Sequence, residues 1–320
     1  MLRSSVIAAS LAALALPAAA GASSVTAVLA PGAYVPLTTF TGGPDVNDVT
    51  FEGRLVFTWT DAAQPLKAKV GCTAGTPVTC LAGDAQVNLG GGDDHFNNPN
   101  SNRSVTVEGG AGNDTLSSNG NITTVSGGAG DDTIDVRANG NPLGFGNGGN
   151  DSLLGGDGFV LKATVSGDGG DDLVVGFSRG DVASGGNGDD EVLSVNGRGT
   201  LDGGAGSDVI VNLGAIPGGL TELGGNGADT IVGTPGGGDA VDAGPGADVI
   251  DISGNDDPAF PISDSVTCGD GKDTVYADAD DVIAADCEKV KPGPAPALPR
   301  VADAIAHLKA TFPAVPTGTY

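Results

Sequence analysis

The sequence predicts an all-β protein, a parallel β-solenoid of about ten coils with a small N-terminal β cap and a short C-terminal helix or tail. Three observations support this fold class. A unit rich in Gly and Asp recurs along the chain, and short β-branched runs stand between its copies. The chain also has 56 Gly against 9 Phe, 3 Tyr and 1 Trp, too few large side chains for a compact core. A solenoid needs fewer of them, because each coil buries only a little against its neighbours.

The recurring unit is six residues long and is followed by an apolar residue. Its clearest copies are 109–116, 127–134, 203–210 and 224–231. Aligned on their last acidic residue, ten copies carry Asp94, Asp114, Asp132, Asp151, Asp172, Asp190, Asp208, Asp229, Asp248 and Asp273. Gly stands two positions before this Asp in all ten copies, and an apolar residue stands two positions after it. The earlier glycines vary: Leu89, Ala243 and Cys268 replace the first, and Asn147 and Asp168 replace the second.

Successive aligned aspartates are 20, 18, 19, 21, 18, 18, 21, 19 and 25 residues apart. Each period has room for two short strands and two turns, so each coil carries one Gly/Asp turn and one degenerate turn such as 118–121 or 138–141. β-branched runs such as 105–107 precede the motifs, and runs such as 133–136 and 209–211 follow them. We therefore expect two parallel sheets that face each other across a thin core of Val, Ile and Leu.

The charge of the chain excludes some functions and suggests another. There are 40 Asp plus Glu against 14 Lys plus Arg, a net charge of −26. Nucleic acids and anionic membranes need a basic surface, so neither is an expected partner. A period near 18 stacks the aspartates on one edge, where neighbouring charges repel by roughly 1 kcal/mol each even in water. A cation between successive turns would reverse that interaction.

The residues around the aspartates favour Ca²⁺ as this cation. Glycines let the backbone bend so that carbonyl groups also face the gap between turns. Carboxylates and carbonyls together supply hard oxygen ligands, which suit Ca²⁺ with six to eight ligands better than the rigid octahedron of Mg²⁺. Ten turns leave nine gaps, so we expect up to nine ions on this edge.

Over about residues 87–280, this pattern resembles the haemolysin-type calcium-binding repeat, also called the RTX or β-roll repeat, with the unit G-G-x-G-x-D-x-U-x. The resemblance implies a right-handed parallel β-roll, with the ten aligned aspartates and turn carbonyls as calcium ligands. Additional acids at the fifth position are expected to be solvated: Asp93, Asp131, Asp171 and Asp189. Family members usually run strict nine-residue repeats and bind ions on both edges. Here the second edge is degenerate, so a one-sided set of ions is expected.

A metal-free reading of the same pattern remains open. In that reading the aspartates cap their turns through hydrogen bonds to the backbone and bind no ion. It leaves the column of negative charges without compensation, and for this reason the calcium reading is favoured.

The N-terminus has the features of a signal peptide: Arg3, an apolar stretch from Val6 to Leu16, and the small residues 18–20. We therefore expect removal of residues 1–20 and a secreted, extracellular protein. No segment is long enough in apolar residues to span a membrane. The expected domains are a β cap at 21–86, calcium-binding repeats at 87–290, and a Pro-rich linker with a helix or tail at 291–320.

Four cysteines fit an oxidising compartment. Three pairings are possible, and the local one, Cys72 with Cys80 and Cys268 with Cys287, is preferred because the two clusters flank the repeats. Zinc ligation would need tighter paired spacing and usually His.

The two ends of the chain lack the repeat. Residues 49–51, 55–59 and 67–70 alternate apolar and polar residues as half-buried strands do. A cap is the simpler interpretation of this module, with carbohydrate binding through Trp59 as an alternative. After the prolines, Val301, Ala304, Ile305, Leu308 and Phe312 recur at helical spacing, which predicts an amphipathic helix that docks on the roll or remains a tail.

No enzyme is predicted. The two histidines, His95 and His307, are interpreted as turn and helix-surface residues, and the zinc-protease motif H-E-x-x-H is absent. The favoured function is calcium binding by a secreted structural or adhesive protein, whose cell-surface or polysaccharide partner the sequence does not identify. The alternatives are a calcium-dependent polysaccharide-active enzyme, a toxin-like protein and a metal-free structural solenoid. The enzyme would need a groove lined by Asp, Arg and aromatic residues, and the toxin a membrane-active apolar domain.

Overall fold

The computed structural model covers residues 1–320 and describes only part of them. The described residues are 24–28, 37–43, 47–52, 56–61, 67–68, 72–73, 78–81, 84–98, 104–119, 124–137, 140–156, 162–176, 180–195, 198–214, 219–233, 237–253 and 262–315. The predicted signal peptide, residues 1–20, lies outside this set.

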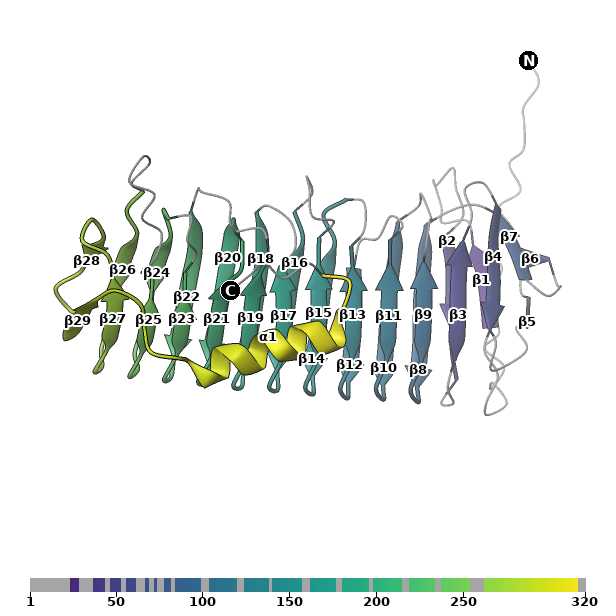
Figure 1. Ribbon diagram of the computed structural model, residues 1–320. Coiled ribbons are helices and arrows are strands. Elements are labelled where there is room, and N and C mark those ends of the chain that lie inside the picture. Colours follow the sequence, from purple (N-terminus) through teal and green to yellow (C-terminus); the bar gives the residue numbers. More distant parts are fainter. Residues whose placement is uncertain are drawn as a thin grey trace, which may run out of the picture.

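Two long sheets extend along the molecule and face each other, with sheet B in front of sheet A in Figure 1. Sheet A has 14 strands in the order β28 (Val282–Ile283), β26 (Ser265–Thr267), β24 (Ala240–Asp242), β22 (Leu220–Asn226), β20 (Gly199–Ala205), β18 (Asp181–Asn187), β16 (Thr164–Gly169), β14 (Leu143–Gly148), β12 (Thr124–Ala129), β10 (Val105–Ala111), β8 (Ala85–Gly91), β2 (Leu37–Thr41), β1 (Ser24–Val28) and β5 (Lys67–Ala68). Sheet B has 15 strands in the order β29 (Lys289–Pro292), β27 (Thr274–Ala277), β25 (Val249–Asp251), β23 (Thr230–Val232), β21 (Val209–Asn212), β19 (Glu191–Ser194), β17 (Leu173–Gly176), β15 (Ser152–Gly155), β13 (Thr133–Val136), β11 (Thr115–Ser118), β9 (His95–Asn98), β3 (Asp48–Glu52), β4 (Val56–Asp61), β7 (Val78–Leu81) and β6 (Cys72–Thr73).

From β8 and β9 onward, consecutive strands alternate between the two sheets, and every neighbouring pair within a sheet is parallel. Equivalent residues stack in register: Thr106 pairs with Thr124 in sheet A, and Thr115 pairs with Thr133 in sheet B. Each coil is therefore one strand, one tight turn, a second strand and a longer connection. The predicted fold class, a parallel β-solenoid, is confirmed.

The strands before residue 84 extend both sheets at the N-terminal end of the stack. β2 and β3 still pair in parallel with β8 and β9, whereas β1, β4, β6 and β7 add by antiparallel pairing. Strands occur where the alternating runs 49–51, 55–59 and 67–70 predict them. Cys72 lies opposite Cys80 in the β6–β7 register. The side chain of Trp59 lies outside the described residues, so its predicted alternative role stays a prediction.

The core is a thin layer between the sheets. In β10, Val105 and Val107 point inward while Thr106 is half-buried on the outer face. Sheet B supplies the opposing side with residues such as Leu116, Ile134 and Ile231, all essentially inaccessible to solvent. Because side chains in a strand alternate faces, one β-branched residue in two is enough to fill this layer.

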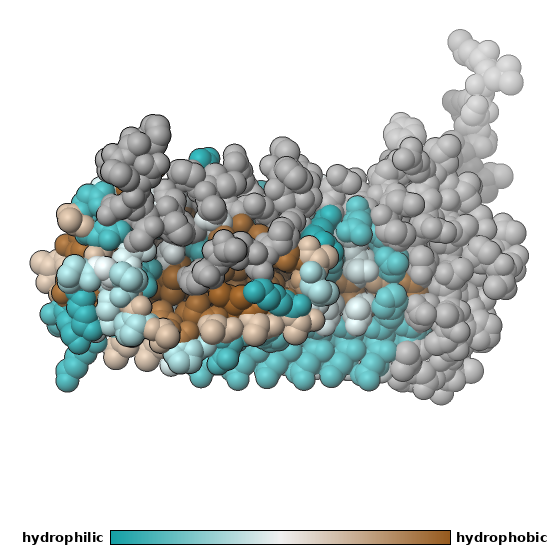
Figure 2. All heavy atoms as spheres, viewed as in Figure 1, coloured by the Kyte–Doolittle hydropathy of each residue, from teal (hydrophilic) through white to brown (hydrophobic). Residues whose placement is uncertain are grey.

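The predicted C-terminal helix is α1 (Pro299–Thr311), and it docks on the outer face of sheet B, crossing its strands (Figure 1). Val301, Ala304 and Leu308 are its buried residues, as the helical spacing predicts. Ile305 is partly buried and Phe312 is buried just after the helix. Figure 2 shows hydrophobic surface gathered beside this helix, and hydrophilic surface along the edge formed by the tight turns.

A single outward row of sheet B explains where the helix lies. In register along the stack, the row runs Asn97, Ser117, Asp135, Leu154, Val175, Leu193, Val211, Val232, Asp251, Tyr276 and Lys291. Its five apolar members span about 19 Å at 4.8 Å per strand, and the 13 residues of α1 span about 19.5 Å. The apolar stretch of the row is thus as long as the helix that covers it.

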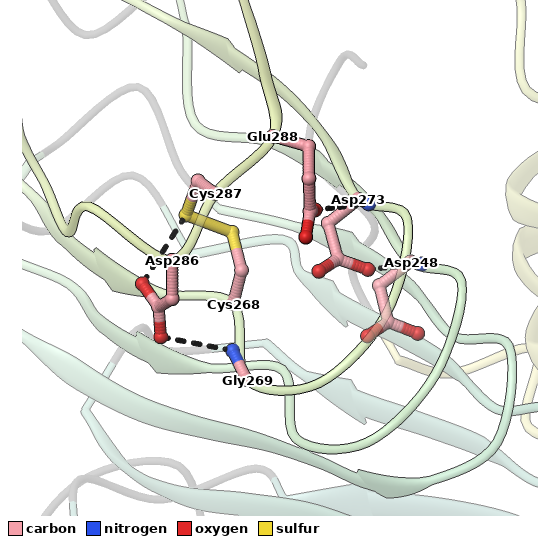
Figure 3. The surroundings of a disulfide bond; sticks show 7 residues. All are labelled: Asp248, Cys268, Gly269, Asp273, Asp286, Cys287 and Glu288. Carbon is pink, nitrogen blue, oxygen red and sulfur yellow. Dashed lines mark hydrogen bonds between the residues drawn. A yellow bond between two sulfur atoms is a disulfide. The ribbon is translucent and has the colours of Figure 1, made fainter.

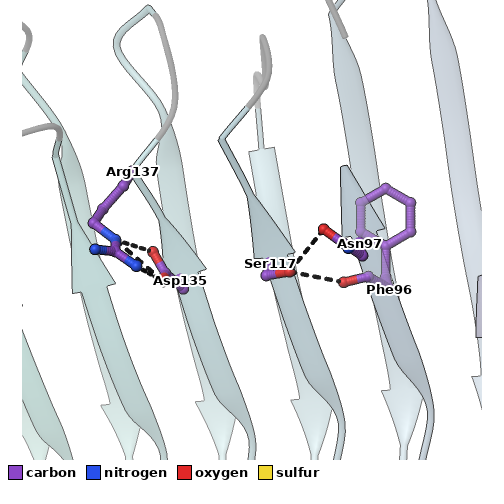
Figure 4. A network of polar contacts seen from close by, with 5 residues as sticks. All are labelled: Phe96, Asn97, Ser117, Asp135 and Arg137. Carbon is purple, nitrogen blue, oxygen red and sulfur yellow. Dashed lines mark hydrogen bonds and ion pairs between the residues drawn. The ribbon is translucent and has the colours of Figure 1, made fainter. Parts of the chain in front are cut away.

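Polar contacts occupy the row where it is not covered (Figure 4). Arg137 makes an ion pair with Asp135, with 2.6 Å between Nη2 and Oδ2. In the neighbouring strands, the Ser117 hydroxyl lies 3.3 Å from Asn97 Oδ1 and 3.4 Å from the carbonyl oxygen of Phe96. These side chains are polar and partly exposed, so they need no covering element.

A disulfide joins the last coils. Cys268 and Cys287 are bonded, which confirms this half of the preferred pairing (Figure 3). Beside it, Asp286 Oδ2 accepts a hydrogen bond of 3.1 Å from the backbone N–H of Gly269. The bond therefore fixes the final turn on the coil beneath it. None of the helices in the described part of the chain is long and apolar enough to cross a membrane.

Candidate functional site

The ten aligned aspartates form a column along one edge, at the corner between each sheet-A strand and the following sheet-B strand. All ten side chains are buried, with at most 2% of their surface exposed. Each Asp stands directly before a sheet-B strand, and the strands that follow Asp94, Asp114 and Asp132 pair in register. The sequence-based expectation that these residues come together on one edge therefore holds for their positions.

One carboxylate oxygen of each Asp is used by the neighbouring coil. Asp172 Oδ1 accepts a hydrogen bond of 2.7 Å from the backbone N–H of Asp151, and Asp190 Oδ1 accepts one of 2.8 Å from Asp172. The same contact recurs along the column at 2.7 to 2.9 Å. Each carboxylate thus caps the turn of the previous coil through its backbone.

The second oxygen points into the turn of its own coil. A Cβ on Gly167 would lie 2.1 Å from Asp172 Oδ2, and one on Gly127 would lie 2.1 Å from Asp132 Oδ2. In the copies that have Gly at this first position, the carboxylate therefore occupies the space that a side chain would need; Leu89, Ala243 and Cys268 show that three copies accommodate a side chain there. In the nine aspartates from Asp114 to Asp273, this Oδ2 is buried and has no hydrogen-bond partner among the described residues.

Burial raises the pKa of these carboxyl groups, so they ionise less readily than an exposed aspartate. Desolvation raises the pKa of Asp114 and Asp151 to about 6, although the backbone hydrogen bond of each opposes the shift. The pKa of Asp132, Asp172 and Asp190 is raised to about 7, again chiefly by desolvation and further by neighbouring aspartates. Without a bound cation, the column therefore holds its negative charge poorly near neutral pH.

The second glycine of the repeat is needed for its backbone conformation. Gly110 and Gly128 adopt φ of 121° and 127°, in a region that side chains disfavour. In the two copies where another residue replaces it, Asn147 and Asp168 take φ of 80° and 74°. Asn and Asp are the residues that tolerate this region best.

The fifth-position acids form a separate, solvent-exposed column. Asp171 Oδ1 accepts a hydrogen bond of 2.9 Å from the N–H of Asp189, and Asp131 Oδ1 accepts one of 2.8 Å from that of Asn150. Asn113 fills the same position between Asp93 and Asp131. Since an amide serves here as well as a carboxylate, this column requires no charge.

Two residues that sequence reasoning missed end the buried column. Asn47 precedes β3 in the position of Asp94, and its backbone N–H donates to Asp94 Oδ1. At the other end Glu288 precedes β29, and its Oε2 accepts a hydrogen bond of 2.9 Å from the N–H of Asp273 (Figure 3). Two sequence features could have predicted these ends of the column: Gly42-Gly43 before Asn47, and the apolar Val290 two residues after Glu288.

A shorter column on the second edge was also missed. Asp239, Asp264 and Asp281 stand before β24, β26 and β28, and Asp264 Oδ1 accepts a hydrogen bond of 2.7 Å from Asp239. Asp239 Oδ1 accepts one of 2.8 Å from Leu220, and Asp181 plays the same part for Ala163 at 2.7 Å. The sequence feature that could have predicted this column is the apolar residue two positions after Asp239, Asp264 and Asp281. The second edge is therefore degenerate over most of its length, but not over the last coils.

The buried column supplies oxygen ligands that suit a hard cation, but it does not supply a complete set of side-chain ligands at any one point. The Oδ2 atoms from Asp114 to Asp273, which have no partner among the described residues, are acceptors that a cation could satisfy. Among the described side chains, however, no three His, Cys, Asp or Glu groups converge on one point that could hold a metal ion. Adjacent Asp residues supply two carboxylates per gap, so turn carbonyls or water would have to complete any coordination shell.

Residues with catalytic potential are not assembled into a site in the part of the chain that is described. His95 begins β9 on the surface, and His307 lies on the exposed face of α1 with Nδ1 2.8 Å from Glu191 Oε2. The sequence contains one Gly-x-Ser-x-Gly motif, at 176–180, whose central residues 177–179 are not described. A nucleophile elbow joins a strand to a helix, whereas this motif joins β17 to β18.

The fold and the column define the class of protein: a parallel β-solenoid whose edge is lined by buried carboxylates. Comparison with protein families, with curated proteins and with solved structures finds no match.

Proposed function

We propose that this protein binds calcium ions along the buried aspartate column, as an exported solenoid of the haemolysin-type repeat class. The observation that carries the proposal is the set of nine buried Oδ2 atoms, from Asp114 to Asp273, for which the described part of the chain provides no partner. A buried, unpaired polar atom costs roughly 1–3 kcal/mol, and a column of them recurs in register at each coil. A cation in each gap would compensate both the missing partner and the charge.

The role of the ions would be structural. Ions that bind the folded coils and not the unfolded chain stabilise the fold by mass action. Calcium would be the natural ligand outside the cell, and the features of a signal peptide at 1–20 support that location. We infer a structural or adhesive extracellular function, because repeat occupies most of the chain. No catalytic centre is proposed.

The competing interpretation is a metal-free solenoid, favoured by one specific observation. The Oδ1 of each of the ten aspartates already accepts a backbone hydrogen bond, and at the end of the column an amide, Asn47, occupies the aspartate position and donates to Asp94 Oδ1 at 3.1 Å. If the column only caps turns, then an amide should serve at every coil.

The substitution Asp172→Asn separates these two functions. It retains an oxygen that can accept the hydrogen bond from Asp151 and removes the charge and the second carboxylate oxygen. The matched control is Asp171→Asn in the exposed column, where Asn113 and Asn150 occur naturally. Bound calcium would be counted by equilibrium dialysis, and folding followed by far-UV circular dichroism during calcium titration, with magnesium as the control ion.

We expect β-structure to grow with calcium and not with magnesium. Asp172→Asn should lose one or two ions and raise the calcium midpoint severalfold, because its carboxylate faces the gaps on both sides, while Asp171→Asn behaves like wild type. A wild-type protein that is fully folded in chelator and binds no calcium would overturn the proposal and leave the metal-free solenoid.

A further inference from the structure

One acidic residue lies inside the hydrophobic core, on the side of the coil opposite to the ten-aspartate column. Glu222 is the third residue of β22 and points inward. Its column in sheet A is otherwise uncharged: Val87, Val107, Val125, Gly144, Val165, Ala183, Leu201, Glu222, Val241, Val266 and Ile283. No repeat motif places a carboxylate at this position, so Glu222 belongs to neither turn column.

The Glu222 side chain is fully buried and unsatisfied. Its exposed fraction is 0%, and neither Oε1 nor Oε2 has a hydrogen-bond partner among the described residues. An ionised carboxylate in such a place costs several kcal/mol unless it is paired. Among the described residues, the charged groups that raise the pKa of Glu222, after its burial, are Asp239 and Asp264, both of them acidic.

Those two neighbours concentrate negative charge at the same corner. Asp239 follows the turn into β24 and binds the N–H of Leu220, two residues before Glu222 on the same inward face. Asp239 Oδ2 also lies 3.4 Å from the amide nitrogen of Asn212, which comes from the opposite sheet. Glu222, Asp239 and Asp264 thus come from three successive coils, and the two aspartates are the charged neighbours of Glu222.

A proton alone satisfies Glu222 incompletely. Protonation would remove the charge, but the hydroxyl would still lack an acceptor and the carbonyl oxygen a donor. A bound cation would neutralise the charge and serve both oxygens. We infer that Glu222 and Asp239 hold one metal cation of the hard, oxygen-preferring class, such as Ca²⁺, inside the solenoid between β22 and β24.

This site is independent of the proposed calcium edge. It lies at the opposite corner of the coil and rests on a residue outside the repeat. The three carboxyl groups do not converge as a metal-binding triad. Asp264 therefore adds charge while its own oxygens bind backbone N–H groups of Asp239 and Gly238, and water or backbone carbonyls complete the coordination.

Two substitutions test the site. Glu222→Gln keeps the shape and removes the charge, and Glu222→Leu repeats the residue found one coil earlier, Leu201. The control is Asp242→Asn, which removes one exposed charge from the outer face of β24. Calcium bound per chain would be counted at saturation, and thermal midpoints measured in calcium and in chelator.

We expect both Glu222 variants to bind one calcium ion fewer than wild type, and Asp242→Asn to bind the same number. In chelator, Glu222→Leu should melt higher than wild type because no charge is buried, while its gain in midpoint on adding calcium should shrink. An unchanged ion count, with Glu222→Leu melting higher in both conditions by the same amount, would overturn the inference and identify Glu222 as a core acid neutralised by a proton.

The same ion counts test the proposed calcium sites of the aspartate column separately from the interior site. If wild type binds one ion that is lost in Glu222→Leu and kept in Asp172→Asn, the interior site stands and the proposed edge fails. If only Asp172→Asn loses ions, the reverse holds.

Discussion

Asp172 Oδ2 occupies the place that a side chain on Gly167 would need: a Cβ there would lie 2.1 Å from this oxygen. The relationship recurs at Gly109 with Asp114 and at Gly185 with Asp190, at 2.2 and 2.3 Å. The first Gly and the Asp of one repeat are therefore a steric pair. In these copies a side chain at the Gly position would clash with the buried carboxylate.

Gly167→Ala should accordingly destabilise the protein by about 1–3 kcal/mol, the usual cost of overpacking a buried site. The control is Gly169→Ala in the same turn, because a Cβ there would meet its nearest atom at 3.6 Å and the backbone φ is ordinary. Urea unfolding of the two variants measures the difference. Equal stabilities would contradict the steric pairing.

The metal-free protein should lose stability as the pH rises. Asp132 and Asp190 have folded-state pKa values raised from 3.8 to about 7, chiefly by desolvation. Each therefore binds its proton more tightly when folded, so its stabilising effect is complete below about pH 4 and is lost as the pH rises through 7. Thermal midpoints in chelator should fall between pH 5 and 8.

Two comparisons check this pH dependence. Asp132→Asn combined with Asp190→Asn should flatten the profile, because amides do not titrate and still accept the backbone hydrogen bonds. Saturating calcium should also reduce the fall, since ions replace protons on the same oxygens. A midpoint that rises with pH in chelator would refute the assignment.

The disulfide between Cys268 and Cys287 should stabilise the last coil. The two residues are 19 positions apart, and closing a loop of this size contributes about 3 kcal/mol. Cys268→Ala with Cys287→Ala removes the bond and places at 268 the residue found one coil earlier, Ala243. Hydrogen exchange should then accelerate in β27 and leave β17 unchanged. Equal protection of β27 in both proteins would show that hydrogen bonds such as Asp273–Glu288 hold this coil unaided.

Docking of α1 should depend on Leu308, which is fully buried against sheet B. Leu308→Ala should weaken docking by about 2–5 kcal/mol, the range for Leu truncations in a core. The matched control is Asp303→Ala on the exposed face of the helix. Trypsin cleavage after Arg300 and Lys309 reports undocking, and equal cleavage rates in the two variants would argue against a docked helix.

Several features could be predicted from the sequence because the repeat is local. The Asp spacing near 18 residues with Gly two positions earlier is sufficient to predict one tight turn per coil, since only glycine freely adopts the backbone conformation such turns require. Stacking of identical turns then brings residues such as Asp172 and Asp190 together. The fold class and the composition of the buried column follow.

Other features depended on register between distant strands. Asn47 and Glu288 do not match the motif, and only pairing of β3 with β9 and of β29 with β27 places them in the column. The buried position of Glu222 also became evident only once Leu201 and Val241 lay on either side of it. A single acidic residue in an alternating strand carries no sign of which face it occupies.

By itself, the sequence determined the solenoid, the aspartate edge and the amphipathic character of the last helix, because each follows from a repeat or a short-range period. Only the tertiary structure decided that one oxygen of each aspartate binds backbone, that the other oxygen has no partner among the described residues from Asp114 to Asp273, and that the helix covers the row from Leu154 to Val232. These outcomes depend on contacts between coils about 20 residues apart or more, where local pattern gives no distance or direction.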